Sequence, residues 1–257
     1  MSRKSKYFTG IILVAIIAVL IFCAIRIFMI RHEYGEGRAA YEKLEDFVNI
    51  VDDTDETDTE QDRNSKFLEI DFNGLKEKYP DIIGWIEFRE LEFSYPILQG
   101  KDNHYYLNHL PDGQTGKCGS IFLDYHNDTN FGDLNSIIYG HNMKDGSMFS
   151  SLRGFKDLSE KANFYIYTPD TVLEYQIISA YQGRASDQAY TYYFSEEKHL
   201  TSFLDTILKS SELGWRNTGY TGNRVVTLST CDNQSSYGRY IVHGKLVRQI
   251  GEVGNEG

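Results

Sequence analysis

The hydrophobic pattern near the start of the chain is that of a membrane-spanning helix. Tyr7–Ile25 is a run of 19 residues without a charge, made mostly of Ile, Val, Leu, Ala and Phe. At about 1.5 Å of rise per residue, such a helix nearly crosses a hydrocarbon core about 30 Å thick. Basic residues precede the run and favour a cytoplasmic N-terminus. The pattern predicts an uncleaved signal anchor over residues 7–30 after a cytoplasmic segment, residues 1–6, with a cleaved signal peptide as the alternative.

A second apolar pattern, over residues 36–51, has the period of a helix. Ala40, Leu44, Phe47 and Val51 fall on one face, which predicts a stalk helix that packs on the following domain. Seven acidic residues follow between Val51 and Lys66. A like-charge block of this kind cannot bury itself and predicts a solvated linker. Residues 31–66 are therefore assigned to a stalk helix and an acidic linker.

The pattern then changes to that of a β-rich domain over residues 67–250, followed by a tail, residues 251–257. Asp71 precedes a short helix, Phe72–Tyr79, that Pro80 ends. Short runs of β-branched and aromatic residues broken by turns then predict eight strands, which suit a closed barrel or a sandwich. The predicted strands are Ile83–Phe88, Tyr95–Leu98, Ser120–Tyr125, Ser136–Tyr139, Asn163–Thr168, Thr171–Ala180, Arg224–Ser229 and Arg239–Val247.

One helix interrupts the later strands. Ser195 is a candidate N-cap, and acidic residues follow it in the first turn. Leu200, Phe203 and Ile207 then form an apolar stripe that ends near Lys209. We expect this helix to lie between the sixth and seventh strands and to pack on the sheet.

Composition narrows the functional classes. A hydrophobic content of 41% supports a real core, and the formal net charge of −11 argues against a nucleic-acid partner. The sequence has no Gly-rich phosphate loop and no CxxC or HExxH motif. It therefore predicts no cofactor and no metal.

The candidate chemistry centres on Cys231 and Arg239. Two predicted strands flank a loop of seven polar and small residues, so they are expected to pair antiparallel. Cys231 closes the first strand and Arg239 opens the second, and the two residues can face each other. A thiol beside a guanidinium favours the thiolate, which is the reactive form.

A cysteine nucleophile also needs a proton partner. His141 follows the short strand Ser136–Tyr139 and Gly140, so it too sits where a strand gives way to a loop. The residues alone leave the other six histidines in competition with it. They also leave open a non-catalytic extracellular β-domain in which Cys118 and Cys231 form a structural disulfide.

The motifs taken together resemble a known family. Thr-Leu-Ser-Thr-Cys231, the arginine on the next strand and Tyr-Gly-His141 resemble the sortases, and class B sortases in particular. The resemblance runs from about Phe67 to Val247. It includes Tyr79-Pro-Asp-Ile-Ile-Gly-Trp-Ile, Tyr95-Pro-Ile-Leu-Gln-Gly, Asn103-His-Tyr-Tyr-Leu and Gly119-Ser-Ile-Phe-Leu-Asp-Tyr.

The resemblance implies a mainly β fold, a closed eight-stranded barrel with N-terminal helices and one helix in the loop between strands 6 and 7. It implies Cys231 as nucleophile, His141 as general acid and base, and Arg239 as the group that stabilises the oxyanion or the substrate. In class B the loop between strands 6 and 7 forms a wall of the substrate groove. The substrate contacts implied here are Ser229, Thr230, Leu107, Tyr190, Thr191 and Tyr192.

The implied activity is that of a membrane-anchored cysteine transpeptidase of Gram-positive bacteria, in the cysteine peptidase class, with its domain outside the cell. Such an enzyme cleaves a C-terminal sorting signal of the Asn-Pro-x-Thr-Asn or Ser-Pro-x-Thr-Gly kind after Thr. It forms a thioester and joins the surface protein to a peptidoglycan amine. The implied partners are surface proteins with such signals, the peptidoglycan acceptor and membrane lipid. A pilin-polymerising sortase is the nearest alternative, and Asp232 or Asn233 is a candidate helper group.

Overall fold

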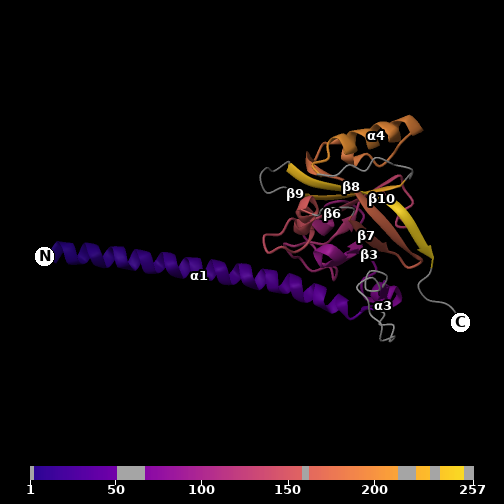
Figure 1. Ribbon diagram of the computed structural model, residues 1–257. Coiled ribbons are helices and arrows are strands. Elements are labelled where there is room, and N and C mark those ends of the chain that lie inside the picture. Colours follow the sequence, from indigo (N-terminus) through magenta and orange to yellow (C-terminus); the bar gives the residue numbers. More distant parts are fainter. Residues whose placement is uncertain (1–2, 51–66, 158–161, 214–223, 232–237, 252–257) are drawn as a thin grey trace, which may run out of the picture.

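A long N-terminal helix leads into a closed β-barrel (Figure 1). The structure is a computed structural model, which gives the backbone position of Cys231. It describes residues 3–50, 67–157, 162–213, 224–231 and 238–251.

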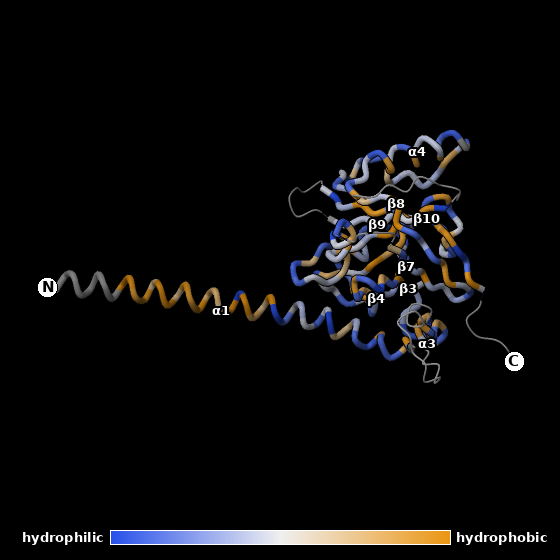
Figure 2. The backbone as a smooth tube through the Cα atoms, in the orientation of Figure 1, coloured by the Kyte–Doolittle hydropathy of each residue, from blue (hydrophilic) through white to orange (hydrophobic). Residues whose placement is uncertain are grey.

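The N-terminal helix α1 (Arg3–Glu45) is 43 residues long and joins the predicted anchor and stalk in one element. Its large apolar side chains from Ile11 to Ile30 are 43–70% exposed, and Figure 2 shows this stretch of α1 as mostly hydrophobic. Within the described residues, α1 is the one helix long and apolar enough to cross a membrane. It is compatible with a membrane anchor.

The stalk prediction was wrong at its C-terminal end. The helix stops at Glu45, and β1 (Val48–Ile50) pairs antiparallel with β2 (Leu68–Ile70). The β-branched residues here satisfy their backbone groups in a strand pair, which overrides the helical spacing of the side chains. The last turns of α1 still pack on the domain, because Leu44 is fully buried and Ala40 is 8% exposed.

The helix predicted after Asp71 is confirmed as α3 (Phe72–Lys78). Asp71 is its N-cap, and the carboxylate accepts a hydrogen bond from the Gly74 N–H at 2.9 Å. Phe72 and Leu75 are its buried residues, so the helix packs on the end of the barrel through one face.

Eight strands close into the predicted barrel, with the order β10-β8-β7-β3-β4-β5-β6-β9. The fold is mainly β, as expected. The barrel strands are β3 (Ile82–Phe88), β4 (Phe93–Leu98), β5 (Phe122–Leu123), β6 (Asn135–Gly140), β7 (Asn163–Tyr167), β8 (Thr171–Arg184), β9 (Val225–Cys231) and β10 (Gly238–Gly251). Short 3-10 segments lie between them at Arg89–Leu91, Tyr105–Leu107, Phe149–Asp157 and Gln188–Tyr190.

Three strands differ most in length from their predictions. The strand expected over Ser120–Tyr125 is only Phe122–Leu123, and the Ser120 N–H instead donates to the Tyr106 carbonyl at 2.8 Å. Strands β8 and β10 are each 14 residues long, because they pair with each other along their whole length. Four fully buried phenylalanines, at 88, 149, 155 and 164, contribute to the barrel core.

The helix α4 (Glu197–Lys209) lies between β8 and β9, the sixth and seventh strands of the barrel, as predicted. Its buried residues Phe203, Leu204 and Ile207 pack against β8 and β10 (Figure 1). The N-cap prediction was wrong: Glu196 is the N-cap, and it makes no side-chain capping hydrogen bond. Ser195 instead pairs through its hydroxyl with Nδ1 of His199 at 3.0 Å.

Candidate active site

Three adjacent strands bring the predicted catalytic residues to one end of the barrel. Strand β6 pairs parallel with β9, with Gly140 opposite Thr230, so His141 and Cys231 follow at neighbouring positions. Strand β10 pairs antiparallel with β9, and Arg239 is the register partner of Cys231. Because paired strands lie about 4.8 Å apart, the backbones of the three residues are close together.

A groove of about 310 Å³ opens at this end of the barrel. It contains five of the predicted site residues: His141, Arg239, Ser229, Leu107 and Tyr190. Sequence reasoning missed the other lining residues. These are Asn103, Phe122, Tyr139, Gly140 and Ala185.

Three predicted substrate contacts lie outside the groove lining. Thr230 is 1% exposed, because it faces the barrel interior while Ser229 faces the groove. Thr191 is half-buried, and its carbonyl accepts a hydrogen bond from Asn135 Nδ2 at 2.8 Å. Tyr192 is 41% exposed and stacks on His126.

The ring of His141 is held by a backbone carbonyl. Its Nε2 donates to the Leu107 carbonyl at 2.6 Å. A carbonyl oxygen can only accept a hydrogen bond, so Nε2 carries a proton in both the neutral and the charged ring. The proton that the ring gains and loses is therefore the one on Nδ1. Leu107 thus takes part in the site through its main chain as well as by lining the groove.

Arg239 supplies the positive charge of the groove. Its side chain is half-buried, and Nη1 donates to the Gly238 carbonyl at 2.8 Å. The guanidinium keeps its charge at any working pH and carries several donors in a planar fork. It can therefore hold a developing negative charge next to β9.

Tyr139 contributes a neutral phenol to the groove. Burial, followed by the nearby carboxylate of Asp124, raises the pKa of Tyr139 well above its ordinary value, although Arg239 acts in the opposite direction. The phenol therefore keeps its proton and donates to Asp124 Oδ2 at 2.9 Å. Its ring is tilted by 36° to that of Phe122, with 5.3 Å between centroids, and lies nearly parallel to that of Tyr190, with 6.2 Å between centroids.

The loop after β8 reaches across the groove to β9. The hydroxyls of Tyr190 and Ser229 are hydrogen-bonded at 2.7 Å. Behind them, Asn135 Nδ2 donates to the carbonyl of Ala189 at 3.1 Å and to that of Thr191. This loop therefore forms one wall of the groove.

Proteins of known family resemble this chain in sequence and in fold. The sortase domain model matches residues 86–247. A sortase B of Listeria monocytogenes is 39% identical over 181 residues, which are 67% of this chain and 72% of that protein. The chain belongs to the sortase family, and within it to class B. Members of the family are in general cysteine transpeptidases.

Two further relatives extend the similarity over most of this sortase. A sortase B of Staphylococcus aureus is 27% identical over 256 residues, 95% of this chain and 99% of that protein. The solved structure of a Staphylococcus aureus sortase B–substrate complex superposes with a TM-score of 0.69 and 28% identity. The superposition covers 84% of this chain and 99% of that chain.

The competing sequence predictions lie elsewhere in this sortase. Cys118 carries a thiol, and its sulfur packs against α1, where a Cβ added at Gly37 would come within 2.7 Å of it. This position argues against the Cys118–Cys231 disulfide. Among the described lining residues of the groove, His141 is the one histidine. The candidate helpers Asp232 and Asn233 lie outside the described residues.

Proposed function

We propose that this sortase cleaves a C-terminal sorting signal after Thr and transfers the Thr carbonyl to an amine of peptidoglycan, with Cys231, His141 and Arg239 as its catalytic set. The register of β6, β9 and β10 carries the proposal. It supports a nucleophile on β9 with a base from the parallel neighbour and a cation from the antiparallel neighbour.

In the acylation step, the Cys231 thiolate attacks the Thr carbonyl carbon of the signal. A carbon–sulfur bond forms, and the carbonyl π electrons move to oxygen, which becomes an oxyanion. Arg239 donates hydrogen bonds to this oxyanion or to the neighbouring substrate backbone. When the oxyanion collapses, the carbon–nitrogen bond breaks, and His141 gives the proton on Nδ1 to the departing amine. The product is a thioester.

In the second step, an amine of the acceptor attacks the thioester carbonyl. His141 takes the proton that the amine loses, and the carbon–sulfur bond breaks to return the Cys231 thiolate. Water can resolve the same thioester by hydrolysis, so the outcome depends on which nucleophile reaches the open side of the groove. The Staphylococcus aureus relative was solved in complex with a substrate, which supports a substrate-binding role for this groove.

The anchor supports the choice of acceptor. With α1 in the membrane and the N-terminus in the cytoplasm, residues 67–250 form the catalytic domain on the outer surface beside nascent cell wall. The partners we propose are surface proteins with an Asn-Pro-x-Thr-Asn or Ser-Pro-x-Thr-Gly signal, the peptidoglycan amine and membrane lipid. The turns of α1 that follow Ile30 connect the proposed anchor to this domain.

The test uses the full chain in detergent micelles with fluorogenic peptides of the two signal kinds. We expect cleavage after Thr and, when a glycine peptide or diaminopimelate is added, a Thr-linked amine product by mass spectrometry. Cys231→Ala should abolish both products. The matched control is Cys118→Ala, which should leave both unchanged, since Cys118 lies against α1.

Two results would argue against the proposal. Cleavage that survives in Cys231→Ala would exclude the nucleophile. No product from the wild type, together with an equal loss of stability in Cys118→Ala and Cys231→Ala, would favour the non-catalytic domain with a disulfide. A lysine-bearing pilin peptide serves as a second acceptor, and transfer to it in preference to the wall amines would favour the pilin-polymerising alternative.

A further inference from the structure

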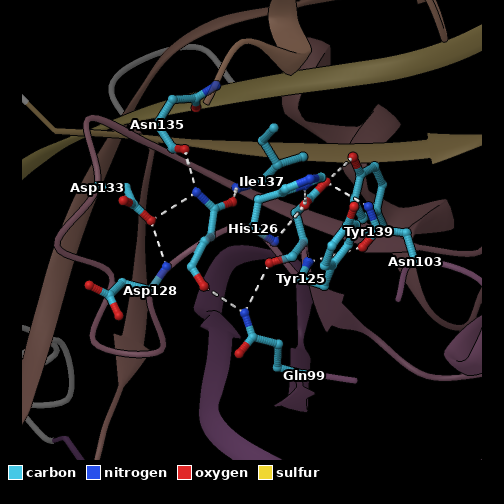
Figure 3. Close-up of polar contacts among 11 residues, drawn as sticks. Gln99, Asn103, Tyr125, His126, Asp128, Asp133, Asn135, Ile137 and Tyr139 are labelled. Carbon is cyan, nitrogen blue, oxygen red and sulfur yellow. Dashed lines mark hydrogen bonds and ion pairs between the residues drawn. The ribbon is translucent and has the colours of Figure 1, made fainter. Parts of the chain in front are cut away.

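A buried carboxylate lies directly behind the groove. Asp124 is 5% exposed and holds two lining side chains through Oδ2: Asn103 Nδ2 donates to it at 2.7 Å and the Tyr139 hydroxyl at 2.9 Å. Its Oδ1 accepts from the backbone N–H of His126 at 3.0 Å and lies 2.8 Å from His126 Nδ1. Figure 3 shows Asn103, His126 and Tyr139 converging on one carboxylate.

The imidazole that Asp124 fixes is stacked on the wall of the groove. The rings of His126 and Tyr192 lie almost parallel, at 12°, with 4.5 Å between centroids. Tyr125 contacts the His126 ring as well, at 3.8 Å between centroids. The carboxylate sets where His126 lies, and His126 in turn offers Tyr192 a flat surface of fixed orientation.

Tyr192 holds the outer side of the wall loop through its stack on His126. Tyr190 bonds Ser229 on the groove side, and Asn135 holds the loop carbonyls from within. Tyr192 lies outside the groove lining, and its ring stacks on His126 of the neighbouring loop. The stack therefore ties the wall to the segment between β5 and β6, whose Asp124 also orients the floor.

We propose that Asp124, His126 and Tyr192 form a latch that fixes the wall of the substrate groove relative to its floor, and that they are positioning residues for the sorting signal. The inference rests on the proposed function, because the ligand that reports it is the signal peptide. In this arrangement Tyr192 acts through His126 and not by touching the peptide. Opening the latch widens the groove and weakens peptide binding, whereas the three catalytic residues stay where the strands hold them.

The latch predicts a change in KM with little change in kcat. His126→Gln keeps a donor for Asp124 but removes the ring, and Tyr192→Leu removes the stacking partner. Each should raise KM about two- to tenfold, the range that corresponds to one aromatic pair. Tyr192→Phe keeps the ring and should restore the wild-type KM. The matched control is Tyr193→Ala, because Tyr193 is the adjacent tyrosine, 74% exposed and outside the groove lining.

A double-mutant cycle separates the latch from a direct substrate contact. If the latch operates, His126→Gln with Tyr192→Leu should raise KM no more than either change alone, because both break the same contact. Full additivity of the two effects on KM would mean that Tyr192 meets the peptide by itself, and would overturn the proposal. Asp124→Asn should also raise KM. If this buried substitution unfolds the chain, His126→Gln still tests the latch.

Amide hydrogen exchange of the full chain without peptide decides the latch independently of activity. Amides of residues 188–194 should exchange at least several times faster in His126→Gln and in Tyr192→Leu than in wild type or Tyr193→Ala. Unchanged exchange in both variants would overturn the latch. If the wild type cleaves no signal peptide, the proposed function fails. The exchange comparison uses no peptide, so it still tests the latch in that case.

Discussion

At the scale of single residues, one backbone carbonyl decides the proton chemistry of His141. The Leu107 carbonyl occupies Nε2 and leaves Nδ1 to exchange protons. The sequence predicted the histidine from its place after a strand, but it could not predict the acceptor. Leu107 lies 34 positions away in the chain, and a main-chain oxygen carries no residue-type signal.

Arg239 offers the sharpest substitution test at this scale. Arg239→Lys keeps the charge but replaces a planar fork with a point charge. We expect kcat/KM for a signal peptide to fall about 10²- to 10³-fold, as when a donor to an oxyanion is lost. Steady-state kinetics with the full chain measure it. The control is Arg248→Lys, at the far end of the same strand, which changes an ion pair with Glu174 and should leave kcat/KM unchanged. Wild-type rates in Arg239→Lys would mean that the positive charge alone is sufficient for catalysis.

We expect the buried His243 to lower the stability of the protein in acid. It is fully buried between Thr227 and the Tyr181 hydroxyl, and burial lowers the pKa of His243 to about 3. The unfolded chain, with a pKa near 6.5, therefore binds more protons between pH 6.5 and 3. The stabilising effect of the neutral ring is present above pH 6.5. It is lost as the pH falls through this window, at about 1.4 kcal/mol for each pH unit.

The expected result is a difference in slope between variants. The free energy of unfolding, from urea titrations at several pH values, should fall with acid more steeply in wild type than in His243→Gln, which cannot take up the proton. His199→Gln, on the exposed face of α4, should follow the wild-type slope. Parallel curves for wild type and His243→Gln would show that the buried histidine does not contribute.

At the scale of elements, the loop of residues 105–120 connects the stalk to the active site. Gly119 has a φ of +53°, and a Cβ there would lie 2.6 Å from the carbonyl oxygen of Leu107. The Gly119 carbonyl in turn accepts a hydrogen bond from the Tyr41 hydroxyl of α1 at 2.8 Å. The stalk therefore braces the same short segment that orients His141.

Gly119→Ala should harm both stability and activity. The left-handed backbone disfavours a side chain by roughly 1–2 kcal/mol, and the clash displaces the carbonyl that holds His141. Gly113→Ala is the control, since Gly113 has a φ of +79° in the same loop but its Cβ would make only an ordinary contact at 3.7 Å. Both variants should lose stability in denaturant titrations, and only Gly119→Ala should lose kcat/KM. Equal kcat/KM in the two would contradict the role of the Leu107 carbonyl.

The sequence predicted elements well where one physical signal dominated. Eight runs of β-branched and aromatic residues became the eight barrel strands, and the Asp71 cap and the apolar stripe of α4 became helices. It failed where pairing with a distant segment decided the outcome, as in β1, which pairs with β2 some 20 residues later (Val48 with Ile70). The groove residue Asn103 was missed for the same reason, because only folding brings it to the groove that His141 lines.

At the scale of the whole molecule, one helix joins the predicted anchor to the barrel. The apolar part of α1 is exposed up to Ile30, whereas Ala40, Tyr41 and Leu44 contact the barrel clusters or lie buried against them. The folded domain therefore begins within the last turns of α1, upstream of residue 67. The boundary expected between residues 66 and 67 separates β1 from its partner β2.

Two fragments should behave differently for this reason. Residues 31–257 lack the apolar part of α1, so they should stay in the supernatant when membranes are sedimented. Their thermal midpoint should equal that of the full chain. Residues 67–257 also lack Leu44, a fully buried side chain. Removal of one such leucine costs about 2–5 kcal/mol, which lowers the midpoint of a domain this size by roughly 10 °C. Calorimetry and circular dichroism measure both midpoints.

A third fragment, residues 46–257, separates the two contributions of the N-terminal region. It keeps β1 paired with β2 but lacks α1 and so the Tyr41 hydroxyl that braces Gly119. We expect this fragment and residues 67–257 to have a similar kcat/KM, lower than that of residues 31–257, because both lack Tyr41. Of the two, residues 46–257 should be the more stable. If residues 67–257 instead equal residues 31–257 in midpoint and in kcat/KM, then α1 only anchors the barrel and does not support the position of His141.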